Sequence, residues 1–473
     1  MSNRTTIGRA VFLAALACLV LTPAHAAVKE PPSFTRPVQD ARAVGAWLAP
    51  RIDLPAIQAE DAANAGRFDI PLRIGLPMHV DLEPGKNGTW EDLAGGDRLW
   101  RLKLESPGAL WMVVGFDAFR MQEGGLLWVY DAGHRTVLGP YGAADVLDHG
   151  ELWPVPIEGD TLYLELLWPA RLRGEQPRVH VGTVSHGYRP FGTLGASEES
   201  GEELLGGSGA CNIDVACPAG DEWHDQARGV VILLSGGSGF CSGSMINNTA
   251  NDCKPYILTA AHCSAGASTA YGFNYQRSAC GSGEPPGPTT QMVSGGTVRA
   301  NFASSDFTLV EMSSLPPQSF NFYLNGWSHD PNPSTSSWVI HHPSGDVKKI
   351  AVDSDPPVNG SNWGPNHWRI DDSSADPAHR GYEAGTTEPG SSGSPLFDQD
   401  HRITGQLHGG SASCSSDTYD EYGKVAASWT GGGTTASRLS DWLDPLNTGA
   451  LGMDGRNGEL CFFNPVGSVT ATR

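Results

Sequence analysis

The sequence predicts an all-β protein built from two domains. The chain has 473 residues, which is long for one ordinary domain. It contains 59 glycines and 34 prolines, and stretches with helical periodicity are scarce. Short strand-like runs separated by turn signals recur along its length, as in β-sandwiches and β-barrels. The net charge of −21 argues against a nucleic acid or an anionic membrane as a partner.

The first 26 residues have the features of a secretory signal peptide. Two arginines give a basic start, an apolar stretch covers 10–20, and Ala24-His25-Ala26 fits a small-x-small cleavage site. The apolar stretch is too short to span a bilayer, and the residues before Cys18 fit a lipoprotein signal poorly. The sequence therefore predicts a secreted, extracellular protein with a signal peptide over 1–26.

Residues 27–205 contain no cysteine and are expected to form a β-rich, sandwich-like domain. Turn signals separate its strand-like runs. These runs are LWRLKLE (99–105), ALWMVVGF (109–116), GLLWVYD (125–131) and DTLYLELLW (160–168). The acidic, Gly-rich stretch GASEESGEELLGGSGA (195–210) has the composition of an exposed linker. We therefore place a domain boundary near residue 206.

Residues 206–473 alternate short β runs with Gly/Ser/Pro loops. The runs are GVVILLS, CSGSMI, YILTAA, FTLVEM, WVIHH and RITGQL. Near the end, ASRLSDWLDP (436–445) places Leu439, Trp442 and Leu443 at helical spacing. A series of strands followed by a short C-terminal helix fits a double β-barrel of the chymotrypsin type.

The cysteines indicate disulfides and not a metal site. Eight of the nine lie between 211 and 461, and the ninth belongs to the signal. An even number of cysteines in an exported chain predicts disulfide bonds. No CxxC pair occurs, so a zinc site is not predicted. His341-His342 is not a metal pair either, because adjacent strand residues point to opposite faces. We expect no metal and no cofactor.

Three short motifs together predict a catalytic triad. LTAAHC supplies His262, SSDFTLVE supplies Asp306, and GSSGSP supplies Ser392. A serine hydroxyl becomes a nucleophile when an imidazole takes its proton, and that imidazole needs a carboxylate to orient it. The order His, Asp, Ser is that of chymotrypsin-type enzymes. The α/β-hydrolase elbow is excluded, because Ser394 occupies its last glycine position and its order starts with serine.

Gly390 completes the predicted machinery. It lets the chain turn so that the backbone N–H groups of Gly390 and Ser392 can face a substrate oxyanion. The residue before the nucleophile is Ser391, where digestive members of the clan carry an aspartate that pairs with the freed amino terminus. The sequence therefore predicts that activation by insertion of the amino terminus does not operate here.

Beyond these motifs, residues 206–450 resemble the bacterial lysyl endopeptidases, which are secreted serine proteases of the chymotrypsin clan. The resemblance is carried by CNIDVACP, NNTAND, SDFTLVE, IHHP, TEPGSSGSP, GQLHGG and SWTGGGTTASRLSDWLDP. The family is made as precursors, which implies that 27–205 is a propeptide acting as intramolecular chaperone or inhibitor of a protease domain at 206–473. We expect protein and peptide substrates, no membrane partner, and a monomer.

The resemblance also implies cleavage after lysine. The family's pocket aspartate corresponds to Asp420 in DEYG, with Glu388 assisting. A buried lysine ammonium needs a paired charge, because an unpaired one is costly to desolvate. Thr386 stands where trypsin-like enzymes place their pocket aspartate, so an acid elsewhere must serve.

A Trp–His stack beside the active site is implied at Trp363 and His408, and His408 raises a rival specificity. Glutamate-specific relatives use a pocket histidine, but Glu388 and Asp420 would repel a glutamate side chain. Cleavage after both lysine and arginine stays open. A catalytically inactive binding homologue is a further alternative, and the intact triad with Gly390 argues against it.

Family disulfides correspond to Cys211–Cys414, Cys217–Cys280 and Cys241–Cys263. Cys253 and Cys461 have no such counterparts; by elimination they form a fourth bridge, with two free thiols as the alternative. The Cys211–Cys414 bridge would tie the start of the mature chain to the second barrel. One observation conflicts with simple self-processing: no lysine lies between Lys103 and Lys254. A lysine-specific enzyme could not cut itself near 205/206.

Overall fold

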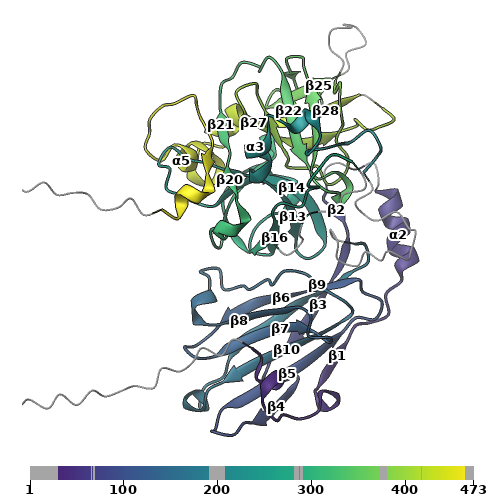
Figure 1. The fold of residues 1–473 in the computed structure, drawn as a ribbon, viewed down its shortest axis with the longest axis vertical. Helices are drawn as coiled ribbons and strands as arrows, with labels where there is room; N and C mark the ends of the chain where they lie inside the picture. The colour runs from purple at the N-terminus through teal and green to yellow at the C-terminus, as the bar shows by residue number, and fades with distance from the viewer. Residues whose placement is uncertain are drawn as a thin grey trace, which may run out of the picture.

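The computed structural model describes residues 30–64, 67, 70–190, 208–281, 287, 291–371, 381–416 and 418–463. The predicted signal peptide and the boundary near residue 206 lie outside these ranges. Figure 1 shows two β-rich units, a lower one formed by residues before 191 and an upper one formed by residues from 208, with helix α2 (Leu54–Ala63) lying beside the upper unit. The prediction of an all-β fold in two domains is therefore confirmed. Within the described ranges, no helix is long and apolar enough to cross a membrane.

The lower unit is a sandwich of two sheets. One sheet contains β1 (Ala46–Leu48), β4 (Thr89–Asp92), β5 (Arg98–Glu105), β7 (Leu126–Asp131), β8 (Val137–Tyr141) and β10 (Thr161–Trp168), in the order β1-β5-β10-β7-β8 with β4 also on β5. The other contains β3 (Gly75–Leu82), β6 (Trp111–Arg120), β9 (Ile157–Glu158) and β11 (Arg178–Gly187), in the order β3-β11-β6-β9. Trp100 and Leu164 of the first sheet meet Phe116 and Val184 of the second in one buried core.

Two helices that precede strands β3 to β11 of the sandwich were not predicted, α1 (Pro32–Thr35) and α2 (Leu54–Ala63). The Asp53 carboxylate caps α2 by accepting the backbone N–H of Ala56 at 3.2 Å. Among the residues of α2, Ile57 is the one buried side chain. The helix therefore lacks the apolar stripe from which helices are recognised in a sequence.

The upper unit contains two large sheets. The first contains β13 (Val230–Ser235), β14 (Gly239–Ile246), β15 (Tyr256–Ala260), β16 (Thr269–Gly272), β17 (Met292–Ser294), β18 (Gly296–Phe302) and β19 (Phe307–Met312), in the order β17-β16-β13-β14-β15-β19-β18. The second contains β12 (Ile213–Asp214), β21 (Gly326–Ser328), β22 (Ser337–His341), β23 (Lys349–Asp353), β24 (Val358–Asn359), β25 (His367–Asp371), β26 (Pro395–Phe397), β27 (Arg402–Gly410), β28 (Tyr419–Lys424) and β29 (Gly452–Met453). A separate pair joins β20 (Tyr323–Leu324) to β30 (Arg456–Asn457). These sheets correspond to the two barrels expected from the sequence.

The C-terminal helix is shorter than predicted. Instead of spanning 436–445, α5 covers Ser440–Leu443 and follows a 3₁₀ turn at Thr435–Ser437. The Thr434 and Ser437 side chains close that turn and separate it from the helix. Leu443 is still buried in the core. The other helices of this unit are α3 (His224–Gly229) and α4 (Val425–Thr430).

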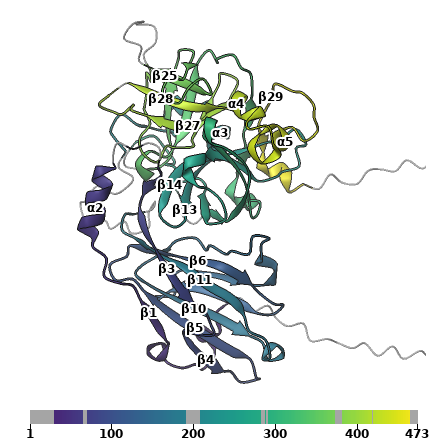
Figure 2. The same cartoon turned by 180° about the vertical axis from the view of Figure 1, so that it is seen from behind.

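The two units share a sheet and an apolar cluster. Strand β2 (Leu72–Arg73) precedes the sandwich strands β3 to β11 in the sequence but pairs antiparallel with β14 of the upper unit. Figure 1 places both strands at the junction, and Figure 2 shows from behind that β14 lies above β3 and β6. Ile74, Trp111 and Val113 pack into one buried cluster with side chains of the upper unit. Those partners are Ile232, Leu234, Phe240, Ala270, Tyr275 and Val347. The N-terminal domain is therefore docked on the upper unit, and not merely tethered to it.

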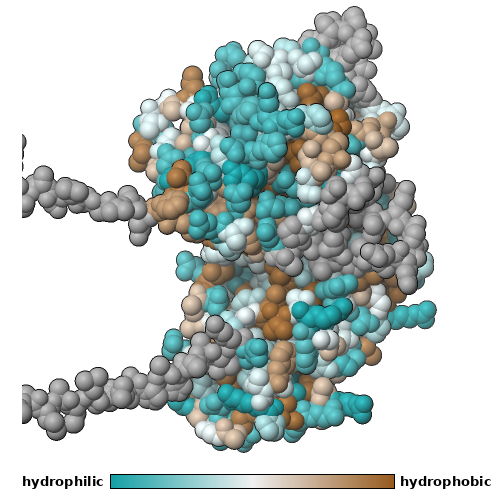
Figure 3. All heavy atoms as spheres, in the orientation of Figure 1, coloured by the Kyte–Doolittle hydropathy of each residue, from teal (hydrophilic) through white to brown (hydrophobic). Residues whose placement is uncertain are grey.

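Four disulfides stabilise the upper unit. They join Cys211 to Cys414, Cys217 to Cys280, Cys241 to Cys263 and Cys253 to Cys461. These are the three pairings implied by the family and the fourth expected by elimination. Figure 3 shows that hydrophilic side chains cover much of this unit on the face in view, in keeping with the high net charge.

Candidate active site

His262 and Asp306 lie next to each other at the ends of paired strands. His262 follows β15, and Asp306, with φ +49°, directly precedes β19, the antiparallel partner of β15. Asp306 Oδ2 lies 2.8 Å from His262 Nδ1, and Asp306 Oδ1 accepts the backbone N–H of His262 at 3.1 Å. The buried carboxylate thereby fixes the orientation of the imidazole. His262 Nε2 has no hydrogen-bond partner among the residues that the structure describes.

Ser392 approaches this pair from the second barrel. Its carbonyl accepts the backbone N–H of Ser242 on β14 at 2.8 Å. The same carbonyl lies 3.7 Å from the sulfur of Cys263, the neighbour of His262. The structure therefore places the backbone of Ser392 beside Cys263, the neighbour of His262, where the two barrels join. The Ser392 hydroxyl is not hydrogen-bonded to His262 here, and such bonds often tighten only when substrate is bound.

Gly390 turns the loop before the nucleophile. Its φ of +100° favours glycine, and a Cβ at this position would lie 3.0 Å from the Phe240 ring and 3.1 Å from the His342 carbonyl. The Gly390 carbonyl is held by the Ser242 hydroxyl at 3.0 Å. The N–H groups of Gly390 and Ser392 have no acceptor within the described ranges. Both donors are thus available to a substrate oxyanion.

Ser391 forms a neutral hydrogen bond where digestive relatives carry a carboxylate. Its hydroxyl lies 2.8 Å from His341 Nδ1 and 3.1 Å from the backbone nitrogen of Glu388. Burial, with the nearby charge of Lys349, lowers the pKa of His341 to about 3. The imidazole is therefore uncharged at neutral pH, and the Ser391–His341 pair offers no charge to an inserted amino terminus. The sequence did not reveal this pair, because its members lie 50 residues apart.

Asp420 is a buried carboxylate on β28. It is 1% exposed, and its Oδ2 accepts the hydroxyls of Thr387 at 2.6 Å and Tyr382 at 3.0 Å. Tyr382 also contacts the Tyr422 hydroxyl. Burial and the charge of Asp420 raise the pKa of Tyr382 well above its usual value, so it stays a hydrogen-bond donor. Tyr382 and Thr387 were missed by sequence reasoning. Thr387 directly precedes the predicted Glu388, which was the available clue.

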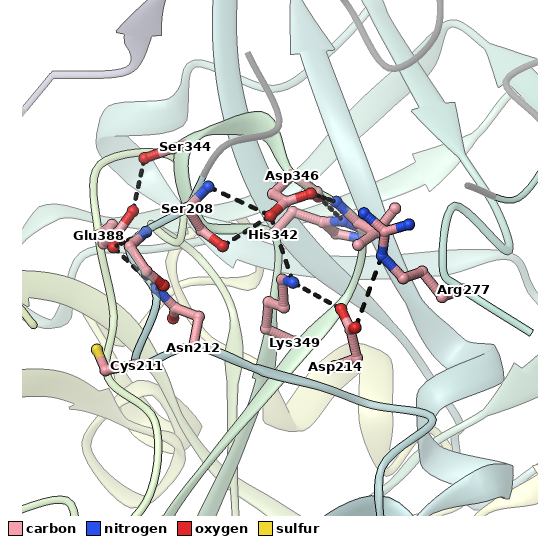
Figure 4. Close-up of polar contacts among 12 residues, drawn as sticks. Ser208, Cys211, Asn212, Asp214, Arg277, His342, Ser344, Asp346, Lys349 and Glu388 are labelled. Carbon is pink, nitrogen blue, oxygen red and sulfur yellow. Dashed lines mark hydrogen bonds and ion pairs between the residues drawn. The ribbon is translucent and has the colours of Figure 1, made fainter. Parts of the chain in front are cut away.

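Glu388 faces a different set of partners from Asp420. Its carboxylate accepts the backbone N–H of Gly209 at 2.8 Å, the Asn212 amide at 2.8 Å and the Ser344 hydroxyl at 2.7 Å. Figure 4 shows these contacts around the segment that follows the linker. The described contacts therefore join Glu388 to the segment that begins the upper unit.

A second carboxylate holds the same segment. Asp346 Oδ2 accepts the Ser208 hydroxyl at 2.7 Å and its backbone N–H at 3.2 Å. Lys349 lies 3.3 Å from Asp346 and 2.6 Å from Asp214, so the charge of Asp346 is balanced within the network (Figure 4). We call Ser208–Asn212, with Asp346 and Glu388, the N-terminal anchor. It connects the segment that begins the upper unit to the loop of Gly390 and Ser392.

Glu388→Gln is expected to weaken this anchor. Three donors lose a charged acceptor, which costs about 1–3 kcal/mol of unfolding free energy. The backbone carbonyl of residue 388 accepts the Ser391 N–H, so a residue 388 that shifts when its side-chain bonds weaken would displace the loop of Ser392, and kcat should fall more than KM rises. Urea unfolding and steady-state kinetics measure both. Glu222→Gln, an exposed change in the same domain, is the control. A rise in KM for lysine substrates alone would instead assign Glu388 to the specificity pocket.

Trp363 and His408 stack beside the triad. Their rings are 4.1 Å apart, and His408 Nε2 lies 3.7 Å from Asp306 Oδ2. His367, which the sequence analysis missed, holds His408 Nδ1 at 3.0 Å. Burial lowers the pKa of His408 to about 4, so its imidazole is neutral at physiological pH. The neutral imidazole of His408 thus lies against the His262–Asp306 pair.

The buried histidines predict a loss of stability in mild acid. Histidine titrates near pH 6.5 in an unfolded chain, whereas burial lowers the pKa of His408 to about 4 and of His341 to about 3. The unfolded state therefore binds more protons below about pH 6.5, and stability falls as the pH falls through this window. The urea concentration at the midpoint of unfolding should fall less steeply between pH 7.5 and pH 4 in His341→Gln than in the unaltered protein. Parallel curves would contradict this account.

Comparison with known proteins identifies the family. Models of two lysyl endopeptidase domains match the chain, the N-terminal domain over residues 48–188 and the C-terminal domain over residues 205–423. The lysyl endopeptidase of Pseudomonas aeruginosa is 27% identical over 390 residues, covering 76% of this chain and 79% of that protein.

Similarity to solved structures is weaker. The active form of the Rv3671c protease from M. tuberculosis shares 16% identity, with a TM-score of 0.26 over 46% of this chain and 81% of that one. A Glu endopeptidase shares 16% identity, with a TM-score of 0.28 over 42% and 85% of the two chains.

With both family domains matched in sequence, the chain is a lysyl endopeptidase-like serine endopeptidase that carries the family's N-terminal, propeptide-like domain.

Proposed function

We propose that this protein is a secreted endopeptidase that cleaves peptide bonds after lysine. The observation that carries the proposal is the buried Asp420 carboxylate, which Thr387 and Tyr382 hold beside the loop of the candidate nucleophile. A lysine ammonium entering that region would find a charge partner that is already oriented. Such pairing offsets the cost of desolvating the ammonium.

The proposed mechanism uses Ser392 as nucleophile. His262 takes the hydroxyl proton at Nε2 while Ser392 Oγ attacks the carbonyl carbon, and Asp306 stabilises the imidazolium through Nδ1. The N–H groups of Gly390 and Ser392 hold the oxyanion. His262 then gives its proton to the leaving amine, which yields an acyl-enzyme. In the second half of the reaction His262 takes a proton from water, which attacks the ester carbonyl, and then returns a proton to Ser392 Oγ as the acid product leaves.

The distribution of lysines favours this specificity. Of the four lysines after residue 206, Lys348, Lys349 and Lys424 are buried. The fourth, Lys254, has a half-exposed side chain. A protease that cuts after lysine thus presents few of its own targets on its folded surface.

The rival specificities are weaker. Because the pKa of His408 is lowered to about 4, its neutral imidazole would give a substrate carboxylate little charge compensation, and Asp420 would repel it. Glu388 stays a predicted second acid of the pocket, and cleavage after arginine is an outcome of the experiment below. An inactive binding homologue is opposed by the oriented His262–Asp306 pair.

The remaining assignments concern the precursor. We place the signal peptide at 1–26, the propeptide at 27–205 and the protease domain from 206, and we propose that the propeptide serves as chaperone and inhibitor of a monomeric enzyme. The shared apolar cluster and the β2–β14 pairing support such a role. Four disulfides are consistent with an exported protein. Because no lysine lies between Lys103 and Lys254, another protease should cut the linker.

A proteome digest tests the specificity. The processed enzyme is incubated with a protein mixture, and mass spectrometry reads the residue before each cut, with Ser392→Ala as control. Cuts almost wholly after lysine are expected. Cuts after glutamate or mixed residues would leave the triad standing and overturn the role of Asp420.

A further inference from the structure

The N-terminal domain inserts a strand into the first barrel of the protease. We propose that this strand, β2, occupies the part of the substrate site that binds the residues following the scissile bond. The domain would then inhibit the protease from the leaving-group side alone. This inference rests on the proposed function, because it takes Ser392 as the nucleophile.

Strand β14 runs directly past the nucleophile loop. Ser242 on β14 donates its backbone N–H to the Ser392 carbonyl at 2.8 Å and its hydroxyl to the Gly390 carbonyl at 3.0 Å. Two residues earlier on the strand, Phe240 packs so closely on Gly390 that a Cβ there would lie 3.0 Å from its ring. A peptide that pairs with this part of β14 therefore lies beside the reacting centre.

The direction of β2 shows which half of a substrate it resembles. Leu72 pairs with Phe240 and Arg73 with Gly239 in antiparallel register, and Ile74 donates its N–H to the Ser238 carbonyl at 2.8 Å. From its amino to its carboxyl end, β2 thus moves away from Ser242 and the nucleophile. A substrate running in the same direction would place its leaving-group residues on β14. Its acyl side would point to the second barrel, which carries Asp420.

The residues before β2 also face the loop before Gly390 across a cavity. Ile70 and Pro71 line one cavity together with Ser344 and Pro389, and Pro389 directly precedes Gly390. Pro71 packs on the backbone of Gly239, since a Cβ on that glycine would lie 3.0 Å from the Pro71 ring. Because β2 already pairs with Gly239 and Phe240, a second extended peptide cannot pair with the same edge of β14.

The N-terminal domain braces the inserted strand. The Arg73 guanidinium donates to Asp61 at 2.8 Å and to the Ile57 carbonyl of α2 at 3.0 Å. Asp61 is fixed in turn by the Tyr188 hydroxyl at 2.7 Å and by Arg189 at 2.9 Å. The strand is therefore presented in its bound conformation, which lowers the entropy cost of occupying the site.

Two substrates that differ only after the scissile bond test the proposal. One is a lysine ester with a small alcohol leaving group, and the other is a peptide with the same acyl part that extends four residues past the lysine. Each is assayed with the uncut full-length chain and with the processed enzyme. Because a tethered strand competes at high effective concentration, kcat/KM of the uncut chain for the peptide should fall by about tenfold or more relative to the ester.

Matched arginine variants show whether β2 causes the difference. Arg73→Ala removes the brace and should restore peptide cleavage by the uncut chain. Arg98→Ala removes a surface ion pair with Asp92 in the same domain and should not. The two side chains are almost equally exposed, at 31% and 32%. Leu72→Pro, which deletes the strand's own N–H, is a second variant with the same expected effect as Arg73→Ala.

The outcomes separate this inference from the function on which it rests. Suppose that the processed enzyme hydrolyses both substrates and that kcat/KM of the uncut chain is unchanged or reduced by the same factor for the ester and the peptide. The proposal that β2 occupies the leaving-group side is then wrong, while the proposed function stands. If the processed enzyme hydrolyses neither lysine substrate, the proposed function fails, and this inference fails with it.

Discussion

Ser392→Ala is expected to lower kcat for peptide hydrolysis by about 10⁶-fold, as loss of the nucleophile does in unrelated enzymes with the same triad. The His262–Asp306 pair, bonded at 2.8 Å, would remain in place but have no hydroxyl to activate. The oxyanion donors and the binding site would also remain, and these leave a residual rate above that in water. Hydrolysis of a lysine peptide and labelling by a fluorophosphonate probe measure the loss.

The loop offers a matched control for this variant. Ser394 lies two residues away, is fully buried, and its hydroxyl has no partner among the described residues. Ser394→Ala removes the same atom from the same loop and should keep both labelling and most activity. Equal loss in both variants would mean that the loop is disrupted, and would leave Ser392 without its assigned role.

Asp420→Asn should reduce kcat/KM for lysine substrates by about a thousandfold, because a buried charge without its partner costs about 3–5 kcal/mol. The amide has nearly the same shape, and its oxygen can still accept the hydroxyls of Thr387 and Tyr382, which bond to Asp420 now. The fold should therefore survive, and the loss should lie in substrate recognition.

A small probe without a cationic group tests this separation. A neutral fluorophosphonate should label Asp420→Asn at close to the original rate, since it does not use the pocket charge. Asp400→Asn, an exposed acid of the same domain, should leave the kinetics with lysine substrates intact. If Asp420→Asn cleaves lysine peptides normally, another group binds the ammonium.

Much of the fold could be predicted because it rests on local patterns. The runs of apolar and β-branched residues became strands β5, β7, β10 and β19 nearly at the expected bounds. The three motifs that contain His262, Asp306 and Ser392 were visible because the residues of each motif are adjacent in the sequence. The helix α2 was missed because it buries only Ile57 and so has no apolar periodicity. Its helical structure depends on packing against neighbouring segments, which the sequence pattern does not show.

Contacts between distant residues escaped the sequence for a different reason. His341 meets Ser391 across 50 residues, and Glu388 meets Gly209 across 179. Nothing near either residue identifies its partner, since the pairing is created by the assembly of the barrels. The pairing of β2 with β14 is the largest such case, because the sequence analysis assigned residues 27–205 to a separate domain and predicted no strand at 72–73.

The disulfides have a consequence for the lifetime of the two halves. All four bridges lie after residue 210, and residues 27–205 contain no cysteine. Once the linker is cut, no covalent bond joins the halves, and only one of them is cross-linked against unfolding. Any protease in the surroundings will therefore digest the uncross-linked half faster. Latency would then end by selective destruction of the inhibitor, at a rate set by the medium into which the precursor is released.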